Sequence, residues 1–137
     1  MQLTPIISIH MSAAIIATVI GPIALWARRG RQQRPRLHRA FGYAWVTVML
    51  VATFSAIFIR DFRLPNVTGF TPIHLLIPVT LATISISIKR LFEGNIQAHR
   101  KYMQGTYVGS CLVAGGFTLV PGRYLGNLVW SQWLGLV

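Results

Sequence analysis

SIHMSAAIIATVIGPIALWARRGRQQRPRLHRAFGYAW, residues 8–45, is followed later in the chain by PIHLLIPVTLATISISIKRLFEGNIQAHRKYMQGTY, residues 72–107. Both stretches read Ile-His, an apolar run, a basic connection, and then His-Arg with an aromatic residue two positions after the arginine. We therefore interpret the chain as a tandem repeat of one two-helix unit, with halves at about 5–59 and 71–121.

Composition places this repeat in a membrane. Of the 137 residues, 53% are hydrophobic and only 11% are charged, a balance typical of membrane proteins. Four apolar runs, each close to the roughly 20 residues that a crossing helix needs, lie at about 5–27, 40–59, 71–89 and 103–121. The sequence predicts an all-α membrane protein of one domain, an up-down-up-down bundle of four transmembrane helices.

Short sequence signals mark the start of the third helix and the end of the fourth. Thr71 before Pro72 is a helix cap followed by a favoured first-turn proline, and Pro121 with Gly122 predicts the end of the fourth helix. The remaining segment, 122–137, is too short to cross and carries two tryptophans, so we expect it to lie at the membrane interface.

The net charge of +11 is concentrated in two connections. Six arginines lie between the first and second runs, and four basic residues surround the connection between the third and fourth: Arg28, Arg29, Arg31, Arg34, Arg36, Arg39, Lys89, Arg90, Arg100 and Lys101. The positive-inside rule predicts that these connections are cytoplasmic and that both termini lie outside. We expect the basic rim to contact the anionic headgroups of the lipid bilayer, and we expect no binding of nucleic acid.

The four histidines form two pairs in this arrangement. When the two halves of the repeat are aligned, His10 matches His74 and, after a gap of three residues, His38 matches His99. The first pair lies near the outer ends of helices one and three, and the second pair at the inner ends of helices two and four. One helix length, about 25 Å, separates the pairs, so all four cannot hold one metal ion.

Two imidazoles that face each other across a bundle match the axial ligands of a six-coordinate b-type haem. We therefore predict haem b, one or two per chain, with the four histidines as iron ligands. Arg39, Arg100 and Lys101 would be partners for the haem propionates. Gly42, Gly105 and Gly109 would leave room for the macrocycle, although Gly-x-x-x-Gly also serves close helix packing.

Each histidine has a simpler interpretation as well. A single intramembrane histidine often hydrogen-bonds a neighbouring helix. His38 and His99, each followed by an arginine, would also suit contacts with lipid phosphate. His10 and His74 lie in apolar sequence without a nearby acid, which favours the outer pair as ligands.

The His-Arg elements, with GPIAL at 21–25 and GTYVG at 105–109, resemble a bacterial family of small predicted membrane proteins, domain of unknown function 2306, over nearly all of the chain. The resemblance implies a four-helix protein of the bacterial cytoplasmic membrane and little chemistry. The two histidine pairs are similar in plan to transmembrane b-type cytochromes with two haems. In those cytochromes the ligands lie deeper in the membrane than His38 and His99 are expected to lie here.

Two functions remain open at this point. The first is a haem b electron-transfer protein, a membrane oxidoreductase or carrier linked to a quinol or another reductant, for which the sequence assigns no catalytic residue. The alternative is a structural or assembly subunit without cofactor, which docks a membrane complex, another copy of itself or anionic lipid through its basic loops.

Overall fold

The computed structural model describes residues 4–31, 33–60, 62, 65 and 67–136, and the statements below concern these residues. The chain begins with two long helices, α1 (Pro5–Trp26) and α2 (Pro35–Ile57). A 3₁₀ turn, η1 (Pro72–Leu75), leads into α3 (Leu76–Phe92). The next helical segments are α4 (Ile96–Thr106), the π-helix η2 (Tyr107–Val113), α5 (Ala114–Thr118), α6 (Tyr124–Asn127) and a second π-helix, η3 (Leu128–Trp133).

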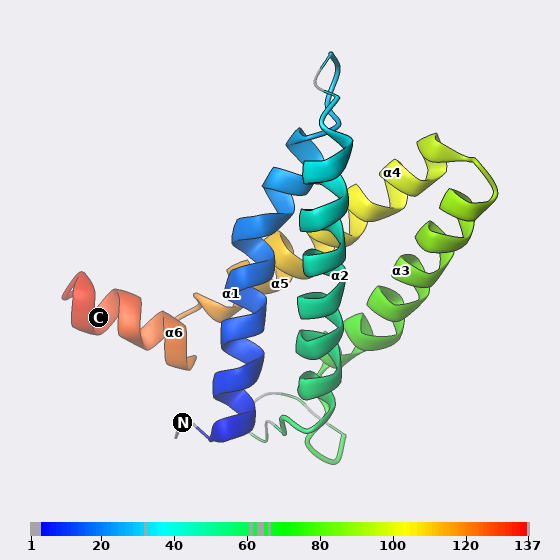
Figure 1. Ribbon diagram of the computed structural model, residues 1–137. Helices are drawn as coiled ribbons and strands as arrows, with labels where there is room; N and C mark the ends of the chain where they lie inside the picture. Colours follow the sequence, from blue (N-terminus) through cyan, green and yellow to red (C-terminus); the bar gives the residue numbers. More distant parts are fainter. Residues whose placement is uncertain (1–3, 32, 61, 63–64, 66, 137) are drawn as a thin grey trace.

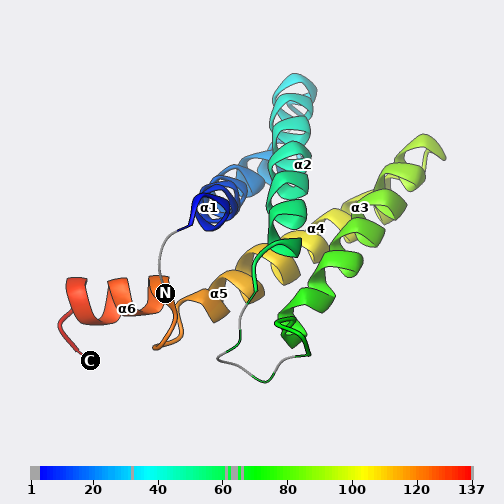
Figure 2. The ribbon, with the colours of Figure 1, turned by 90° about the horizontal axis from the view of Figure 1, so that it is seen from below.

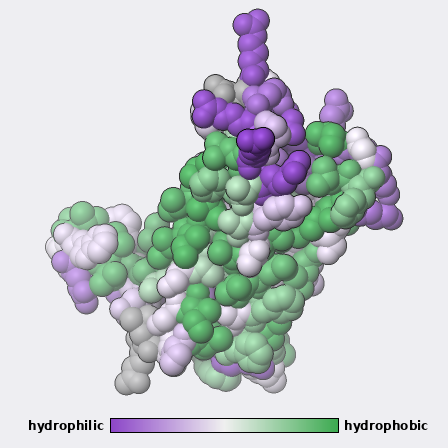
Figure 3. Space-filling model, in the orientation of Figure 1, coloured by the Kyte–Doolittle hydropathy of each residue, from purple (hydrophilic) through white to green (hydrophobic). Residues whose placement is uncertain are grey.

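The described residues contain no β-strand, only an isolated bridge between Val67 and Phe70, so the predicted all-α class is confirmed. Three helices are long and apolar enough to cross a membrane: α1, α2 and the helix from Pro72 to Phe92. Figure 3 shows an apolar surface over most of the length of these helices, with hydrophilic residues gathered at one end. The chain thus has the surface of a membrane protein.

A further long helix follows the third. The residues that join α4 to η2 and η2 to α5, Tyr107 and Ala114, have right-handed helical dihedral angles, so the backbone stays helical from 96 to 118. Figure 1 shows α4 and α5 in one line. The π-helical stretch inside it uses the wider turn that occurs mostly as short insertions in α-helices.

The helices are arranged as two hairpins. α1 and α2 are antiparallel and pack along their lengths, and α3 packs similarly against α4. Packing between the hairpins is much sparser, and the line of α4 and α5 runs obliquely past α1 and α2 (Figures 1 and 2). The basic connection after α1 and the turn after α3 lie at the same end of the molecule (Figure 1).

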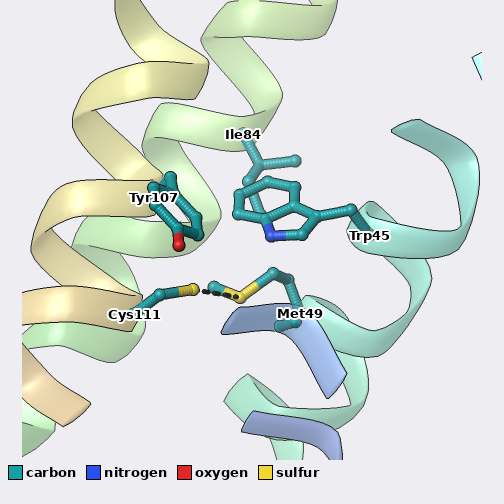
Figure 4. Packing of buried hydrophobic residues seen from close by; sticks show 6 residues of the cluster. Trp45, Met49, Ile84, Tyr107 and Cys111 are labelled. Carbon is teal, nitrogen blue, oxygen red and sulfur yellow. Dashed lines mark hydrogen bonds between the residues drawn. The ribbon is translucent and has the colours of Figure 1, made fainter. Parts of the chain in front are cut away.

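One small core joins the hairpins (Figure 4). It contains Ala17, Trp45, Met49, Ile84, Tyr107 and Cys111, which come from α1, α2, α3 and η2. Trp45 is 4% exposed and Tyr107 is 9% exposed. The Tyr107 hydroxyl donates to the carbonyl oxygen of Thr18 at 3.0 Å. Aromatic packing together with this hydrogen bond fixes the second hairpin against α1.

Two helices begin earlier than the apolar runs predict, because their first turns contain polar residues. α2 begins at Pro35 rather than near 40, because proline is well placed in a first turn. α4 begins at Ile96 rather than near 103, because the Asn95 side chain caps it by accepting from the Ala98 backbone N–H at 3.0 Å. Apolar runs alone miss such basic first turns.

The other predicted helix ends agree with the structure only in part. The predicted cap at Thr71 with Pro72 in the first turn is confirmed, although that turn is 3₁₀. The fourth helical segment ends at Thr118, three residues before Pro121. In the loop after α2, Arg60 donates to the Thr68 carbonyl oxygen at 3.1 Å. Asp61 and Arg63 lie outside the described residues.

Candidate functional site

The first histidine, His10, lies on α1 and bonds α2. Its Nδ1 lies 2.8 Å from the carbonyl oxygen of Ala52 and 3.2 Å from Oγ of Ser55. The Ser55 hydroxyl itself donates to the same carbonyl, at 2.9 Å. Because a carbonyl oxygen only accepts, Nδ1 carries the hydrogen. Nε2 of the neutral ring then keeps its lone pair.

His38 and His99 repeat this geometry at the basic end. Nδ1 of His38, on α2, lies 2.7 Å from the carbonyl oxygen of Ala24 on α1. Nδ1 of His99, on α4, lies 3.1 Å from the carbonyl oxygen of Ser87 and 2.9 Å from its hydroxyl, which also contacts the carbonyl of His99. Each ring therefore binds the preceding helix of its own hairpin through Nδ1–H, and each neutral ring keeps a lone pair on Nε2.

His74 is held differently. Its Nδ1 accepts from the backbone N–H of Thr71 at 3.1 Å, as part of a capping box, and its Nε2 lies 2.9 Å from the carbonyl oxygen of Ile59. Its ring also packs edge-on against Phe70. Both ring nitrogens are thus engaged, so His74 would have to release Ile59 before Nε2 could bind a metal.

The two predicted pairs occupy opposite ends of the core. His38 precedes Trp45 by seven residues and His99 precedes Tyr107 by eight, about 10 and 12 Å of helix. Trp45 and Tyr107 belong to one packed cluster, so His38 and His99 both lie on the basic side of it, on helices that run obliquely to each other (Figure 1). At the other end, His10 and His74 contact carbonyl oxygens near the end of α2, those of Ala52 and Ile59.

Among the predicted propionate partners, Arg100 bridges the hairpins, because its Nη2 donates to the carbonyl oxygen of Arg28 at 2.8 Å. Arg39 and Lys101 are exposed near the same end. A guanidinium that donates one N–H to a carbonyl oxygen in this way can still donate its other N–H groups to an anion. The basic end therefore presents positive charge close to His38 and His99.

The three predicted spacing residues, Gly42, Gly105 and Gly109, all face open space. A Cβ atom added at any of them would meet nothing within 4 Å, apart from the helix's own backbone. They do not act as close-packing contacts between helices here. The close approach occurs instead at Gly21, where an added Cβ would lie 2.6 Å from the Tyr107 ring.

Among the described residues, the four histidines do not gather into one metal centre. Within the described part of the chain, no group of three or more His, Cys, Asp or Glu residues gathers to hold a metal ion. A histidine whose Nδ1–H is fixed by a carbonyl presents an oriented Nε2, which is how many metal-binding histidines are held. His10, His38 and His99 meet this condition.

Sequence reasoning missed the groups that hold these rings. The backbone carbonyls of Ala24, Ala52 and Ser87 cannot be recognised in a sequence.

The hydroxyl pairs between α3 and the helix that follows it do have a sequence signal. Thr80 bonds Ser110 at 2.7 Å and Thr83 bonds Thr106 at 2.8 Å. Thr80, Thr83 and Ser87 follow the i, i+3, i+7 spacing of one helix face.

Comparison with known proteins gives one match. A family model described as "Predicted membrane protein (DUF2306)" matches residues 7–120. No curated protein and no solved structure matches the chain.

Proposed function

The chain belongs to the DUF2306 family of predicted membrane proteins, and from the setting of its histidines we propose that it is a haem b-binding electron-transfer protein of the bacterial cytoplasmic membrane. Its donor would be a quinol or another reductant, and the bilayer would be its permanent partner. The fourth helical segment, residues 96–118, would cross as well, which would put both termini on the same side. With the basic connections in the cytoplasm, as the positive-inside rule predicts, that side would be the outside.

The observation that supports this proposal is the hydrogen-bonding pattern that His38 and His99 have in common. Each donates Nδ1–H to the preceding helix, through the carbonyls of Ala24 and Ser87, and each keeps Nε2 for a ligand. They lie on α2 and α4, one in each hairpin, and both are near the basic end. We therefore place the first haem at this inner pair, reversing the order of preference that the apolar setting of the outer pair gave.

The residues around this pair have definable tasks. His38 and His99 would supply the axial nitrogens, and Arg39, Arg100 and Lys101 would bind the propionates. Gly42 and Gly105, which face open space, would leave room beside the rings. The haem supplies the one-electron redox chemistry, and the protein sets its surroundings and its accessibility.

A second haem at the outer pair requires one rearrangement. His10 already presents Nε2, but His74 holds the carbonyl of Ile59 through its own Nε2. Binding there would cost that hydrogen bond, which in membrane helices averages about 0.6 kcal/mol. A coordinate bond to iron would readily offset a loss of that size.

The test is a reduced-minus-oxidised visible spectrum of the detergent-purified protein, with the haem-to-protein ratio. We expect a sharp b-type band. The haem of the inner pair, and its share of the band, should be lost in His99→Ala and in His38→Gln, whose amide can still donate to the Ala24 carbonyl and so preserve the hairpin. His10→Ala should lower the ratio only if the outer pair also holds a haem.

Arg36→Gln is the matched control, because Arg36 is exposed in the first turn of α2 and should leave the band unchanged. Circular dichroism would confirm that each variant stays helical. Full haem content in both His38→Gln and His99→Ala would refute the inner site. Protein without haem, from cells that make haem, would refute the proposal as a whole.

A second candidate function rests on the exposed basic residues. All six arginines from Arg28 to Arg39 and the pair Arg100 and Lys101 are exposed at one end of the molecule. This supports a structural or assembly subunit that docks a membrane complex, or a second copy of the chain, through its cytoplasmic face. In that case Arg-to-Gln changes at 28–36 would abolish co-purification of the partner, while histidine changes would not.

A further inference from the structure

A groove of about 510 Å³ lies between α3 and α4, beginning at their basic ends. Arg90 in the last turn of α3 and Asn95 in the turn line its opening. From there it follows one face of α4, past Lys101 and Tyr102 to Gly105. Since four residues of α4 span about 6 Å, the groove extends from the charged rim toward the apolar part of the hairpin.

The opening of the groove is cationic. Arg90 donates a hydrogen bond from Nη1 to the Glu93 carboxylate at 2.9 Å, and Nζ of Lys89 lies 3.9 Å from the same carboxylate. These are the ion pairs found within the described residues, so the Lys101 ammonium has no carboxylate partner there. Arg90 and Lys101 both line the groove, and of these two only Arg90 has a carboxylate partner in the described part of the chain, which favours a bound anion between them.

The inner part of the groove is different in character. Thr106 donates its hydroxyl to Thr83, which in turn donates to the carbonyl oxygen of Val79 at 2.9 Å. Their donors are therefore used, and their methyl groups remain. Gly105 contributes no side chain, and an added Cβ there would meet nothing within 4 Å. This end suits a hydrocarbon chain better than a polar ligand.

We propose that this groove is a specific site for an anionic phospholipid. Because Lys101 and Gly105 also belong to the proposed haem site, the lipid would occupy the groove in molecules that hold no haem at the inner pair. The phosphate would lie between Arg90 and Lys101, and one acyl chain would follow α4 past Gly105. The other exposed arginines attract headgroups diffusely. Here a positive opening continues into an apolar channel between two helices, which selects an amphiphile with a negative head.

The site can be tested by native mass spectrometry of the protein taken from vesicles of equal parts phosphatidylglycerol and phosphatidylcholine, reading the haem-free molecules, which differ in mass from any that hold haem. We expect the wild type to retain one phosphatidylglycerol. Lys101→Gln should lower this retention roughly fivefold, since one lysine near a membrane surface contributes about 1 kcal/mol. Gly105→Leu should lower it at least as much, because the new side chain fills the groove without a clash.

Two matched variants serve as controls. Arg36→Gln removes one exposed charge from the other connection, and Gly115→Leu adds the same side chain at a glycine that also faces open space but lies outside the groove. Both should retain the lipid. Equal retention of the two lipids, equal loss in the controls, or displacement of the lipid by an excess of inorganic phosphate would overturn the proposal.

Discussion

At the scale of single residues, Gly21 decides whether the hairpins can meet. A Cβ atom at this position would lie 2.6 Å from Cδ2 and Cε2 of Tyr107 and 2.9 Å from Nε1 of Trp45. Both rings are buried, so neither can move aside cheaply. The contact between α1 and the two aromatic rings therefore depends on the absence of one methyl group.

We expect Gly21→Ala to lower the free energy of unfolding by about 1–3 kcal/mol, the usual cost of overpacking a core. Thermal unfolding in detergent, followed by circular dichroism, measures it. Gly42→Ala is the control, because a Cβ there meets nothing, and alanine favours helix over glycine. Equal melting temperatures for the two variants would show that the close approach at Gly21 does not exist.

At the scale of the helical element, the α3–α4 hairpin is joined by side-chain hydrogen bonds at three successive levels. Ser87 bonds His99, Thr83 bonds Thr106, and Thr80 bonds Ser110. Polar pairs of this kind hold helices together in lipid, where no hydrophobic effect acts between them. The stripe thus explains how a helix that carries Gly105, Gly109 and two more glycines can pack at all.

A double-mutant cycle tests one of these pairs. Thr83→Val and Thr106→Val should show a coupling of about 0.6 kcal/mol, with about 1.7 as an upper limit, in the free energy of unfolding in detergent. Thr47→Val, combined with Thr83→Val, is the control, since the Thr47 hydroxyl donates to Tyr43 within α2. Additive effects for the first pair would contradict the assigned hydrogen bond.

The all-α class and the three helices that could cross a membrane could be predicted from the sequence, because apolar runs and caps such as Thr71 are local signals. The roles of the histidines could not. His10 and His74 align in the repeat, yet one bonds a neighbouring helix and the other caps its own. That difference arises from the carbonyls of Ala52 and Ile59, and only the tertiary structure brings backbone oxygens to a ring.

At the scale of the whole molecule, the basic end gives the chain its expected direction in the membrane. A topology test uses the Cys111→Ser protein, because Cys111 is the sole cysteine and is buried. Single cysteines would then replace Gln33, Val67 or Ser131, all of them exposed. A membrane-impermeant maleimide applied to spheroplasts should label Val67→Cys and Ser131→Cys, and label Gln33→Cys only after permeabilisation.

The third position separates three crossings from four. Ser131 lies beyond the helical segment 96–118, so labelling it from the same side as Val67 requires that segment to cross. Protection of Ser131→Cys in intact spheroplasts would leave three crossings. Labelling of Gln33→Cys without permeabilisation would mean the opposite orientation.

The histidine–carbonyl bonds have a consequence for how the protein is made. His10 and His38 bond only within the first hairpin, at Ala52 and Ala24, and His99 bonds only within the second, at Ser87. Each hairpin can therefore finish its own hydrogen bonds as it leaves the insertion machinery, before the other half has been synthesised. Bonds that cross between the halves, such as those from His74 to Ile59, Arg100 to Arg28 and Tyr107 to Thr18, can form only when the halves meet around Trp45. Biogenesis would then divide into two insertions and one late docking step.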